Sequence, residues 1–184
     1  MRRLAVALVH YPILARDGST VTTAITNLDI HDIARTCHTY GVERYSLVHP
    51  VAAQRELAAR VVEHWTTGSG ARRIPDRRPA MERVQIEEDL EAARIAWDPA
   101  AELWVTSAQP MVDCVEHTEA RALLKDEGVP ALLVLGTGWG LSPQVTEKAA
   151  MRLAPIRSPR SDGYNHLSVR AAAAILLDRL LGAA

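Results

Sequence analysis

The segment at residues 164–170 (YNHLSVR) gathers side chains that can donate, accept or transfer a proton. It holds an aromatic ring, an amide, an imidazole, a hydroxyl and a guanidinium, and the chain that follows it is almost wholly apolar. Because an imidazole titrates near neutral pH, His166 is a candidate general base. Asn165 and Ser168 can also cap a helix, since their oxygens accept bonds from the free N–H groups of its first turn. The segment predicts ligand contact, helix capping, or both.

The segment at residues 136–141 (GTGWGL) places glycine at every second position. Glycine adopts backbone angles that other residues avoid, so this stretch can wrap closely around a flat ligand and present N–H donors to it. The spacing differs from the G-x-G-x-x-G of dinucleotide-binding proteins, and no acidic residue follows at about 20 positions to hold a ribose. A nucleotide-dependent oxidoreductase is therefore disfavoured. An ordinary glycine-rich turn before a helix remains the alternative.

These two segments, and a third at residues 106–108 (TSA), each follow a stretch with the pattern of a β-strand. The run before the glycines, VPALLVL, is continuously apolar, which is typical of a strand buried on both faces of a parallel sheet. The carboxyl ends of parallel strands meet at one edge of a sheet. We therefore expect the loops at residues 106–108, 136–141 and 156–168 to form one pocket.

The elements that must hold these loops alternate along the chain between β-rich runs and helical periodicity. Strands are expected at residues 4–11, 44–49, 103–108, 129–135 and 151–156. Helices are expected at residues 28–40, with Asp29 as the N-cap, and at 51–65, 87–97, 113–127 and 166–181, with a short helix after Ser142 and Pro143. We predict a single α/β domain, residues 1–184, whose mostly parallel sheet carries helices on both faces.

The composition, with 48% hydrophobic and 23% charged residues among 184, is typical of soluble globular proteins. A formal net charge of −1 argues against a protein that coats nucleic acid without specificity. A local basic patch is nevertheless expected at residues 68–83, where five arginines meet two acidic residues and an exposed loop is predicted. No apolar run reaches the ~18 residues of a membrane span. Two distant cysteines predict neither a disulfide framework nor a metal cluster, so we expect a cytoplasmic protein.

Taken together, five segments make the chain resemble the SPOUT class of knotted AdoMet-dependent methyltransferases, and most closely its bacterial SAM-dependent RNA methyltransferase family. They are the opening LALVHYP-like strand, TNLDIHDIARTCHTYGV, QRELAARVVEHW, VLGTGWGLS and PIRSPRSDGYNHLSVRAAAAILLDRL, so the resemblance covers nearly the whole chain. In the related SpoU branch an asparagine is followed six positions later by an arginine, and Asp29 and Arg35 stand at those positions here. GTGWGLS lacks the glutamate of the second SpoU motif, and in YNHLSVRAA the asparagine is displaced by one position.

The resemblance implies a C-terminal trefoil knot, a homodimer, and methyl transfer from S-adenosyl-L-methionine to tRNA or rRNA. It also implies that backbone groups of the three loops hold this cofactor. The residues expected at the cofactor are Thr106, Ser107, Ala108, Leu135, Gly136, Thr137, Gly138, Trp139, Gly140, Leu141, Ile156, Tyr164, Asn165, Leu167 and Ser168. A catalytically inactive AdoMet-binding protein with an RNA-binding or regulatory role is the alternative, because the motif glutamate is missing.

Methyl transfer needs an acceptor that is held in position and deprotonated. The resemblance makes Arg35 a candidate for holding a phosphate or polarising the acceptor, and Asn165 and His166 complete the candidate catalytic residues. Trp139 and Tyr164 can stack on an adenine or a base, or serve as packing. The residues expected to contact RNA are Arg35, Arg72, Arg73, Arg77 and Arg78, for which simple solvation is the alternative.

The helix expected at residues 166–181 is apolar on most of its circumference. A helix of this kind needs cover on more than one side. The sheet can cover one side, so a second subunit is expected to cover another, which agrees with the homodimer that the resemblance implies.

Overall fold

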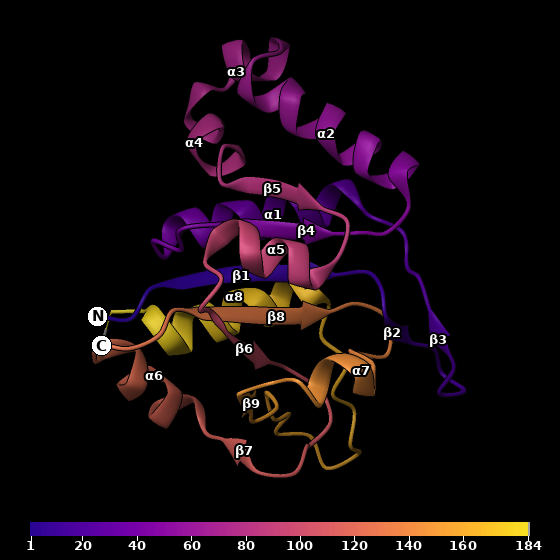
Figure 1. Cartoon of the computed structure of the whole chain (residues 1–184), viewed down its shortest axis with the longest axis vertical. Helices are drawn as coiled ribbons and strands as arrows, with labels where there is room; N and C mark the ends of the chain where they lie inside the picture. Colours follow the sequence, from indigo (N-terminus) through magenta and orange to yellow (C-terminus); the bar gives the residue numbers. More distant parts are fainter. Residues whose placement is uncertain (184) are drawn as a thin grey trace.

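The computed structural model describes residues 1–183 and is built around a sheet of seven parallel strands (Figure 1). The strands are β1 (Leu4–Val9), β4 (Tyr45–Val48), β5 (Val84–Glu87), β6 (Glu102–Val105), β7 (Cys114–Val115), β8 (Ala131–Gly136) and β9 (Met151–Leu153). Their order across the sheet is β5-β4-β1-β8-β6-β9-β7, and the neighbouring strands pair in parallel. The expected mostly parallel α/β sheet is confirmed.

Helices lie on both faces of this sheet, and a small antiparallel hairpin stands at one edge (Figure 1). The helices are α1 (Asn27–Thr39), α2 (Ala52–Thr66), α3 (Ser69–Arg73), α4 (Arg78–Met81), α5 (Leu90–Trp97), α6 (His117–Lys125), α7 (Pro143–Thr146) and α8 (Val169–Leu181). The hairpin consists of β2 (Ile13–Leu14) and β3 (Thr20–Val21). No helix of residues 1–183 has the length and apolar character needed to cross a membrane.

The strand β1 shows how the sheet divides the core into two layers. Its six residues are all buried, as expected for a strand covered on both faces. Val6 and Leu8 belong to a core shared with α1, α6 and α8, whereas Ala5, Ala7 and Val9 belong to a second core shared with α5 and α7. Side chains alternate between the faces of a strand, so the continuous apolar run supplies both cores at once.

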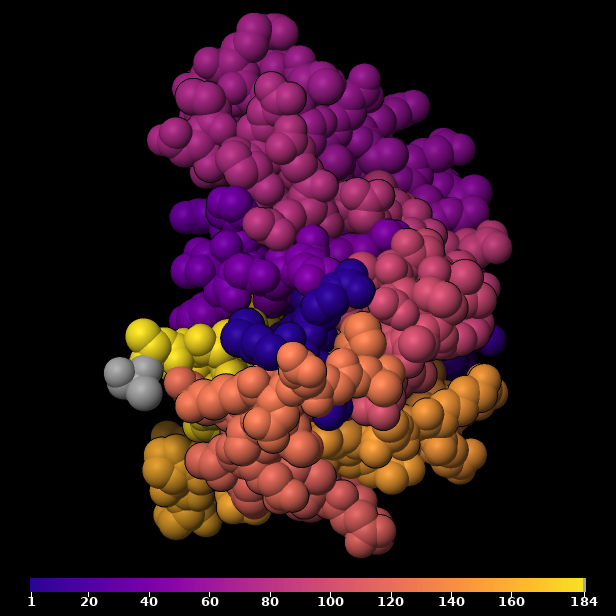
Figure 2. Space-filling model, turned by 60° about the vertical axis from the view of Figure 1, so that its left-hand side comes forward, coloured from indigo at the N-terminus to yellow at the C-terminus, as the bar shows by residue number. Residues whose placement is uncertain are grey.

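Residues 52–81, which we call the α2–α4 arm, form a lobe at one end of the molecule (Figure 2). The prediction of an exposed basic loop at residues 68–83 is wrong in part, because the segment folds into α3, a 3-10 turn at Pro75–Arg77 and α4. Ala80 and Met81 are buried and anchor the segment, and the Arg77 guanidinium lies 4.4 Å from the centre of the Trp65 ring. Three of the five arginines, Arg72, Arg73 and Arg78, are exposed, whereas Arg77 and Arg83 are partly buried.

The first residues of α1 and α8 differ from the predicted ones, because several polar residues near each start could serve as the N-cap. Thr26, not Asp29, is the N-cap of α1, and its hydroxyl accepts a hydrogen bond from the Asp29 N–H at 3.2 Å. Ser168 caps α8 by accepting from the Ala171 N–H at 3.2 Å, so residues 166–168 lie outside the helix that was expected to include them. Asp29 is thereby free to use its carboxylate elsewhere.

Two predicted helices are shorter than expected because a strand occupies part of each range. The expected helix at residues 87–97 contains the last residue of β5, which the sequence analysis missed, and then α5. The expected helix at residues 113–127 is divided into β7 and α6. Both strands are outer strands of the sheet, β5 at one edge and β7 at the other, where short runs leave little periodicity to recognise.

Candidate functional site

A cavity of about 530 Å³ opens at the carboxyl edge of the sheet. Its walls come from the loops after β6, β8 and β9 together with the first turns of α1 and α8. These loops meet because the three strands are neighbours in a parallel sheet. The structure therefore confirms that the loops at 106–108, 136–141 and 156–168 share one pocket, of a size in the ~300 to 1,000 Å³ range of small-molecule sites.

Most residues expected at the cofactor line this cavity. They are Thr106, Ser107, Ala108, Leu135, Gly136, Thr137, Gly138, Trp139, Gly140, Ile156, Asn165, Leu167 and Ser168, and the candidate base His166 joins them. Two expected residues do not. Leu141 is buried and forms an isolated bridge with Ile13, and Tyr164 is 60% exposed outside the cavity wall.

Arg35 also lies apart from the cavity, although it shares α1 with Asp29, which lines it. Six positions on an α-helix rotate a side chain through about 600°, so two such residues point about 120° apart. Asp29 is accordingly buried at the cavity and Arg35 is exposed to solvent. Within one chain, the spacing that carries the resemblance does not bring this pair to one site.

The glycine-rich loop keeps a conformation that only glycine adopts readily. Gly138 has φ +56° and Gly140 has φ +106°, both in the left-handed region. A Cβ on Gly136 would lie 2.8 Å from the backbone nitrogen of Leu141, so the loop returns too close to itself for any side chain there. These constraints explain why glycines alternate in the sequence.

The β2–β3 hairpin supports the glycine-rich loop from outside. The Leu14 N–H donates to the Gly140 carbonyl at 2.9 Å, and the Trp139 N–H donates to the Leu14 carbonyl at 3.1 Å. The Thr137 hydroxyl donates to the Val9 carbonyl at 3.3 Å and also contacts the Thr23 hydroxyl. The loop is thus fixed by backbone bonds to a neighbouring hairpin and does not depend on a ligand for its shape.

Asn165 fastens the other two loops to each other. Its side-chain amide donates to the Ile156 carbonyl at 2.8 Å and to the Ala108 carbonyl at 3.4 Å. Of the two capping residues proposed from the sequence, Ser168 does cap α8. Asn165 instead positions the loop after β9 against the loop after β6.

An ion pair between α1 and α8 forms the polar wall of the cavity, and the sequence analysis missed it. The Arg170 Nη1 donates to the Asp29 Oδ1 at 2.9 Å, while the Asp29 Oδ2 accepts from the Thr26 hydroxyl at 2.6 Å. The Arg170 Nε lies 3.3 Å from a carboxylate oxygen of Asp32. The Asp29 side chain is only 6% exposed. The sequence signal that could have indicated this ion pair is the charged Arg170 at the start of an otherwise apolar helix.

Behind the cavity, at the end of β1, His10 is fully buried. Burial, and secondarily the neighbouring His49, lowers the pKa of His10 to about 4, so its ring is neutral at neutral pH. Its Nδ1 lies 3.3 Å from the Val48 carbonyl, and its ring centre is 5.5 Å from that of His49. His10 does not line the cavity and serves the packing of this edge of the sheet.

The lining fits a cofactor that combines a flat base, a sugar and a charged tail. Apolar groups of Leu135, Ile156 and Leu176 can hold a ring, and Gly136, Gly138 and Gly140 present backbone without side chains to the cavity. Asp29 and Arg170 are charged residues in the wall, and they are paired with each other, so charged groups of a ligand would meet an ion pair there. S-adenosyl-L-methionine has all of these parts.

Comparison with known proteins identifies the family by sequence. A family model described as SAM-dependent RNA methyltransferase matches residues 3–182. A protein from Nitratidesulfovibrio vulgaris named tRNA (guanine-N(1)-)-methyltransferase is 44% identical over 185 residues, which cover 98% of this chain and 42% of that protein. The chain thus spans less than half the length of that relative.

Solved structures show the same fold at low sequence identity. A probable methyltransferase from Bordetella pertussis superposes with a TM-score of 0.65 at 18% identity, covering 97% of this chain and 92% of that one. The TrmH/SpoU tRNA modifying enzyme from Aquifex aeolicus superposes with a TM-score of 0.56 at 17% identity, covering 98% and 75%. These similarities extend over nearly the whole chain and include the sheet edge that carries the cavity.

Proposed function

The chain belongs to the SAM-dependent RNA methyltransferase family, and from this membership we propose that it transfers a methyl group from S-adenosyl-L-methionine to an RNA. The observation that carries the proposal is the cavity at the carboxyl edge of the sheet, where three loops with fixed conformations converge. The proposed substrate class, tRNA or rRNA, is the one expected from the sequence.

In this proposal the cofactor lies against the glycine-rich loop and the loops at 106–108 and 156–168. S-adenosyl-L-methionine supplies a methyl group on a positively charged sulfur, which is already electrophilic. The remaining tasks of the chain are to hold the acceptor near that methyl group and to accept its proton. His166 is exposed at the cavity wall and can take the proton, while Asn165 positions the loop that carries His166.

Cofactor binding and methyl transfer are tested separately. Calorimetry with S-adenosylhomocysteine measures occupation of the cavity, and transfer of tritium from labelled cofactor to bulk RNA measures the reaction. We expect both signals from the wild-type protein. Binding without transfer to any RNA would favour the alternative of an inactive AdoMet-binding regulatory protein. The absence of a glutamate from GTGWGLS is the sequence feature behind that alternative.

The acceptor atom is not carried over from the relatives. The name tRNA (guanine-N(1)-)-methyltransferase belongs to a protein of which this chain covers 42%, so the named activity can reside in the rest of that protein. Mass spectrometry of RNA nucleosides from cells with and without the gene identifies the product. A missing methylated base and a missing 2′-O-methyl nucleoside are the two outcomes that distinguish base from ribose acceptors.

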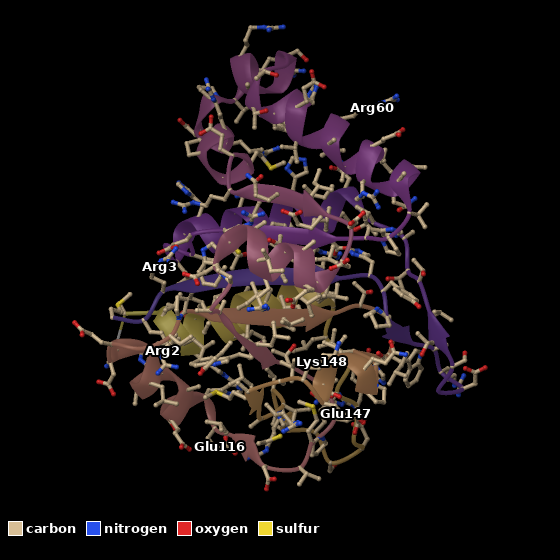
Figure 3. The ribbon with its side chains drawn as sticks, viewed as in Figure 1. Arg2, Arg3, Arg60, Glu116, Glu147 and Lys148 are labelled. Carbon is tan, nitrogen blue, oxygen red and sulfur yellow. The ribbon has the colours of Figure 1, made fainter. Side chains whose placement is uncertain are left out.

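We also propose that the α2–α4 arm contacts RNA phosphates. Support comes from the exposed arginines Arg72, Arg73 and Arg78 and from Arg60, which points away from α2 (Figure 3). α2 begins near the carboxyl edge of the sheet and runs away from it, so α3 and α4 lie at the far end of the arm (Figure 1). Within one chain the arm therefore offers a basic surface that is separate from the cavity. The exposed Arg35 on α1 can extend this surface.

The arm is tested by changing Arg72, Arg73, Arg77 and Arg78 to glutamine. The slope of the logarithm of the RNA-binding constant against the logarithm of the salt concentration should become shallower by about 0.7 to 0.9 for each phosphate contact that is lost. Arg35→Ala should reduce methyl transfer at saturating cofactor by ~10² if Arg35 acts on the acceptor. Affinity for S-adenosylhomocysteine should be unchanged in both variants, and an unchanged salt slope would remove the arm from the RNA surface.

A homodimer remains part of the proposal. α8 buries Ala173, Leu176, Leu177 and Leu180 within the chain, while Ala171, Ala174 and Ile175 keep part of their surface accessible. Helix α1 packs against α8, and its residue Leu28 is 59% exposed. Light scattering at micromolar concentration measures the mass in solution, and a monomer would contradict the dimer.

Three expectations from the sequence stay predictions. They are the C-terminal trefoil knot, the single domain over residues 1–184, of which Ala184 lies outside the described residues, and the cytoplasmic location. The two free cysteines, Cys37 and Cys114, are compatible with a reducing compartment.

A further inference from the structure

We propose that Trp139, Tyr164, His166 and Arg16, which we call the mouth cluster, bind an unpaired RNA base beside the nucleotide that receives the methyl group. The proposal rests on the proposed function and specifies its substrate as RNA whose bases are unstacked at the cavity. It also assigns Trp139 and Tyr164, which the sequence analysis placed at the cofactor, to the RNA.

The cluster brings together side chains from three separate segments. The His166 ring lies between two others, with its centre 5.7 Å from that of Trp139 and 5.6 Å from that of Tyr164. The Arg16 guanidinium, from the turn of the β2–β3 hairpin, lies 6.0 Å from the centre of the Trp139 ring. Three rings and a cation therefore form one continuous surface.

This surface is open to solvent to an unusual degree for aromatic residues. Trp139 is 55% exposed and Tyr164 is 60% exposed. Large aromatic side chains usually bury most of their area, and a group of them left in water marks a site for a partner. The Trp139 N–H donates to the Leu14 carbonyl, so the backbone that carries the ring is anchored to the β2–β3 hairpin.

The position of the cluster separates an RNA role from a cofactor role. Trp139 and His166 line the cavity, whereas Tyr164 lies outside its wall. The cluster thus crosses the rim from the inside to the outer surface. A ligand held wholly within the cavity does not reach Tyr164, but a chain of nucleotides that places one residue in the cavity continues across the rim.

The chemistry of the cluster selects a nucleic acid base. Every base has a π-face, and stacking on aromatic or guanidinium groups is how proteins bind single-stranded RNA. Arg16 provides a positive charge for the adjoining phosphate, and no ion pair within residues 1–183 uses it. A base inside a duplex is covered on both faces by its neighbours, so the cluster requires an unpaired strand.

The test compares Tyr164→Ala with Trp97→Ala as a matched control. Trp97 also forms a surface pair with an arginine, because the Arg3 guanidinium lies 5.3 Å from its ring centre. Arg3 precedes β1, at the amino edge of the sheet and away from the cavity (Figure 3). Both variants remove a partly exposed aromatic ring, and only one of them belongs to the mouth cluster.

The probes are a fluorescently labelled single-stranded RNA of mixed sequence and the duplex formed with its complement, each titrated at saturating S-adenosylhomocysteine. Stacking contributes about 1–3 kcal/mol per base. Tyr164→Ala should therefore weaken binding of the single strand by about 5-fold or more, since 1.4 kcal/mol corresponds to tenfold. Tyr164→Phe should retain affinity, because it keeps the ring. Trp97→Ala should bind the single strand as tightly as the wild type does. Tyr164→Ala should not weaken binding of the duplex.

Four results would overturn the proposal: no binding of single-stranded RNA by the wild-type protein, equal affinities for Tyr164→Ala and Trp97→Ala, a duplex bound as tightly as the single strand, or weaker S-adenosylhomocysteine binding in Tyr164→Ala. The last result would make the cluster a cover for the cofactor. Failure of the proposed function is separate. It appears as absent tritium transfer by a wild-type protein that still binds single-stranded RNA through Tyr164.

Discussion

Gly138 tests whether the glycine-rich loop must keep its conformation for the cofactor to bind. Its φ is +56°, and a Cβ there would lie 3.0 Å from the Ile13 Cγ2 and 3.3 Å from the Leu14 carbonyl oxygen. The left-handed conformation costs an L-residue about 1–2 kcal/mol, and a β-branched side chain adds to that cost. The added atoms press against the β2–β3 hairpin and its neighbour Thr23. We expect Gly138→Val to destabilise the ligand-bound fold by at least about 2 kcal/mol.

This destabilisation is measured as two losses: a lower free energy of unfolding of the ligand-free protein and a lower affinity for S-adenosylhomocysteine. If the loop keeps its shape, the free energy of unfolding of the ligand-free protein falls by the whole amount. If the loop relaxes away from the strain, stability is retained and affinity for S-adenosylhomocysteine falls by roughly 30-fold, which corresponds to 2 kcal/mol. The sum of the two losses is set by the strain, so it should reach about 2 kcal/mol in either case.

Urea denaturation gives the first loss and calorimetry with S-adenosylhomocysteine gives the second. Gly41→Val is the matched control, because Gly41 has φ +71°, lies just after α1, and offers open space in which a Cβ would meet no other atom within 4 Å. It should lose stability through φ alone and keep its affinity. Gly138→Val with stability and affinity both unchanged would refute the reasoning, as would an equal loss of affinity in Gly41→Val.

Other predictions concern the buried charges and the thiols. Arg170→Ala leaves the Asp29 carboxylate buried without its cation and should lower the free energy of unfolding by roughly 3 kcal/mol, part of which Asp29→Asn should restore in a double-mutant cycle. The pKa of His10 is about 4 in the folded state and about 6.5 when unfolded, so the unfolded state binds more protons between these values. The His10 contribution to stability should be fully present above pH 6.5 and fall by up to roughly 3 kcal/mol as the pH falls to 4. Urea melts should therefore show a shallower pH slope for His10→Gln than for the wild type, and the remaining slope comes from His31, His49 and His117, whose pKa values burial also lowers. Burial raises the pKa of the Cys37 thiol to about 12, so mass spectrometry after alkylation should find Cys114 modified first and Cys37 modified only on unfolding.

The sheet and the cavity could be predicted from the sequence because their signals are local. An apolar run such as the one in β8 indicates a buried parallel strand, and the loop after such a strand must lie at the carboxyl edge. The glycines of GTGWGL required no partner to be recognised as a close-approach loop. These inferences depend on neighbouring residues only, and the structure confirms them.

The parts that could not be predicted depend on contacts between distant residues. Asp29 and Arg170 are 141 positions apart, and either one alone has the pattern of a cap or a solvated side chain. The same limit applies to the α2–α4 arm, where short helices are anchored by the burial of Met81 and by Arg77 against Trp65. Arg35 was matched by a motif, and helix rotation carries it away from the cavity.

The two bonds of Asn165 have a consequence for the chemical ageing of the protein. Both are donated by the side-chain NH₂, to the carbonyls of Ile156 and Ala108. Spontaneous deamidation replaces that NH₂ by an oxygen, and an ionised carboxylate has no proton to donate. Two attractive contacts would then become repulsions between oxygen atoms, and the loops after β6 and β9 would separate. Deamidation of Asn165, a change of about one mass unit, would therefore remove both bonds that join the loops after β6 and β9.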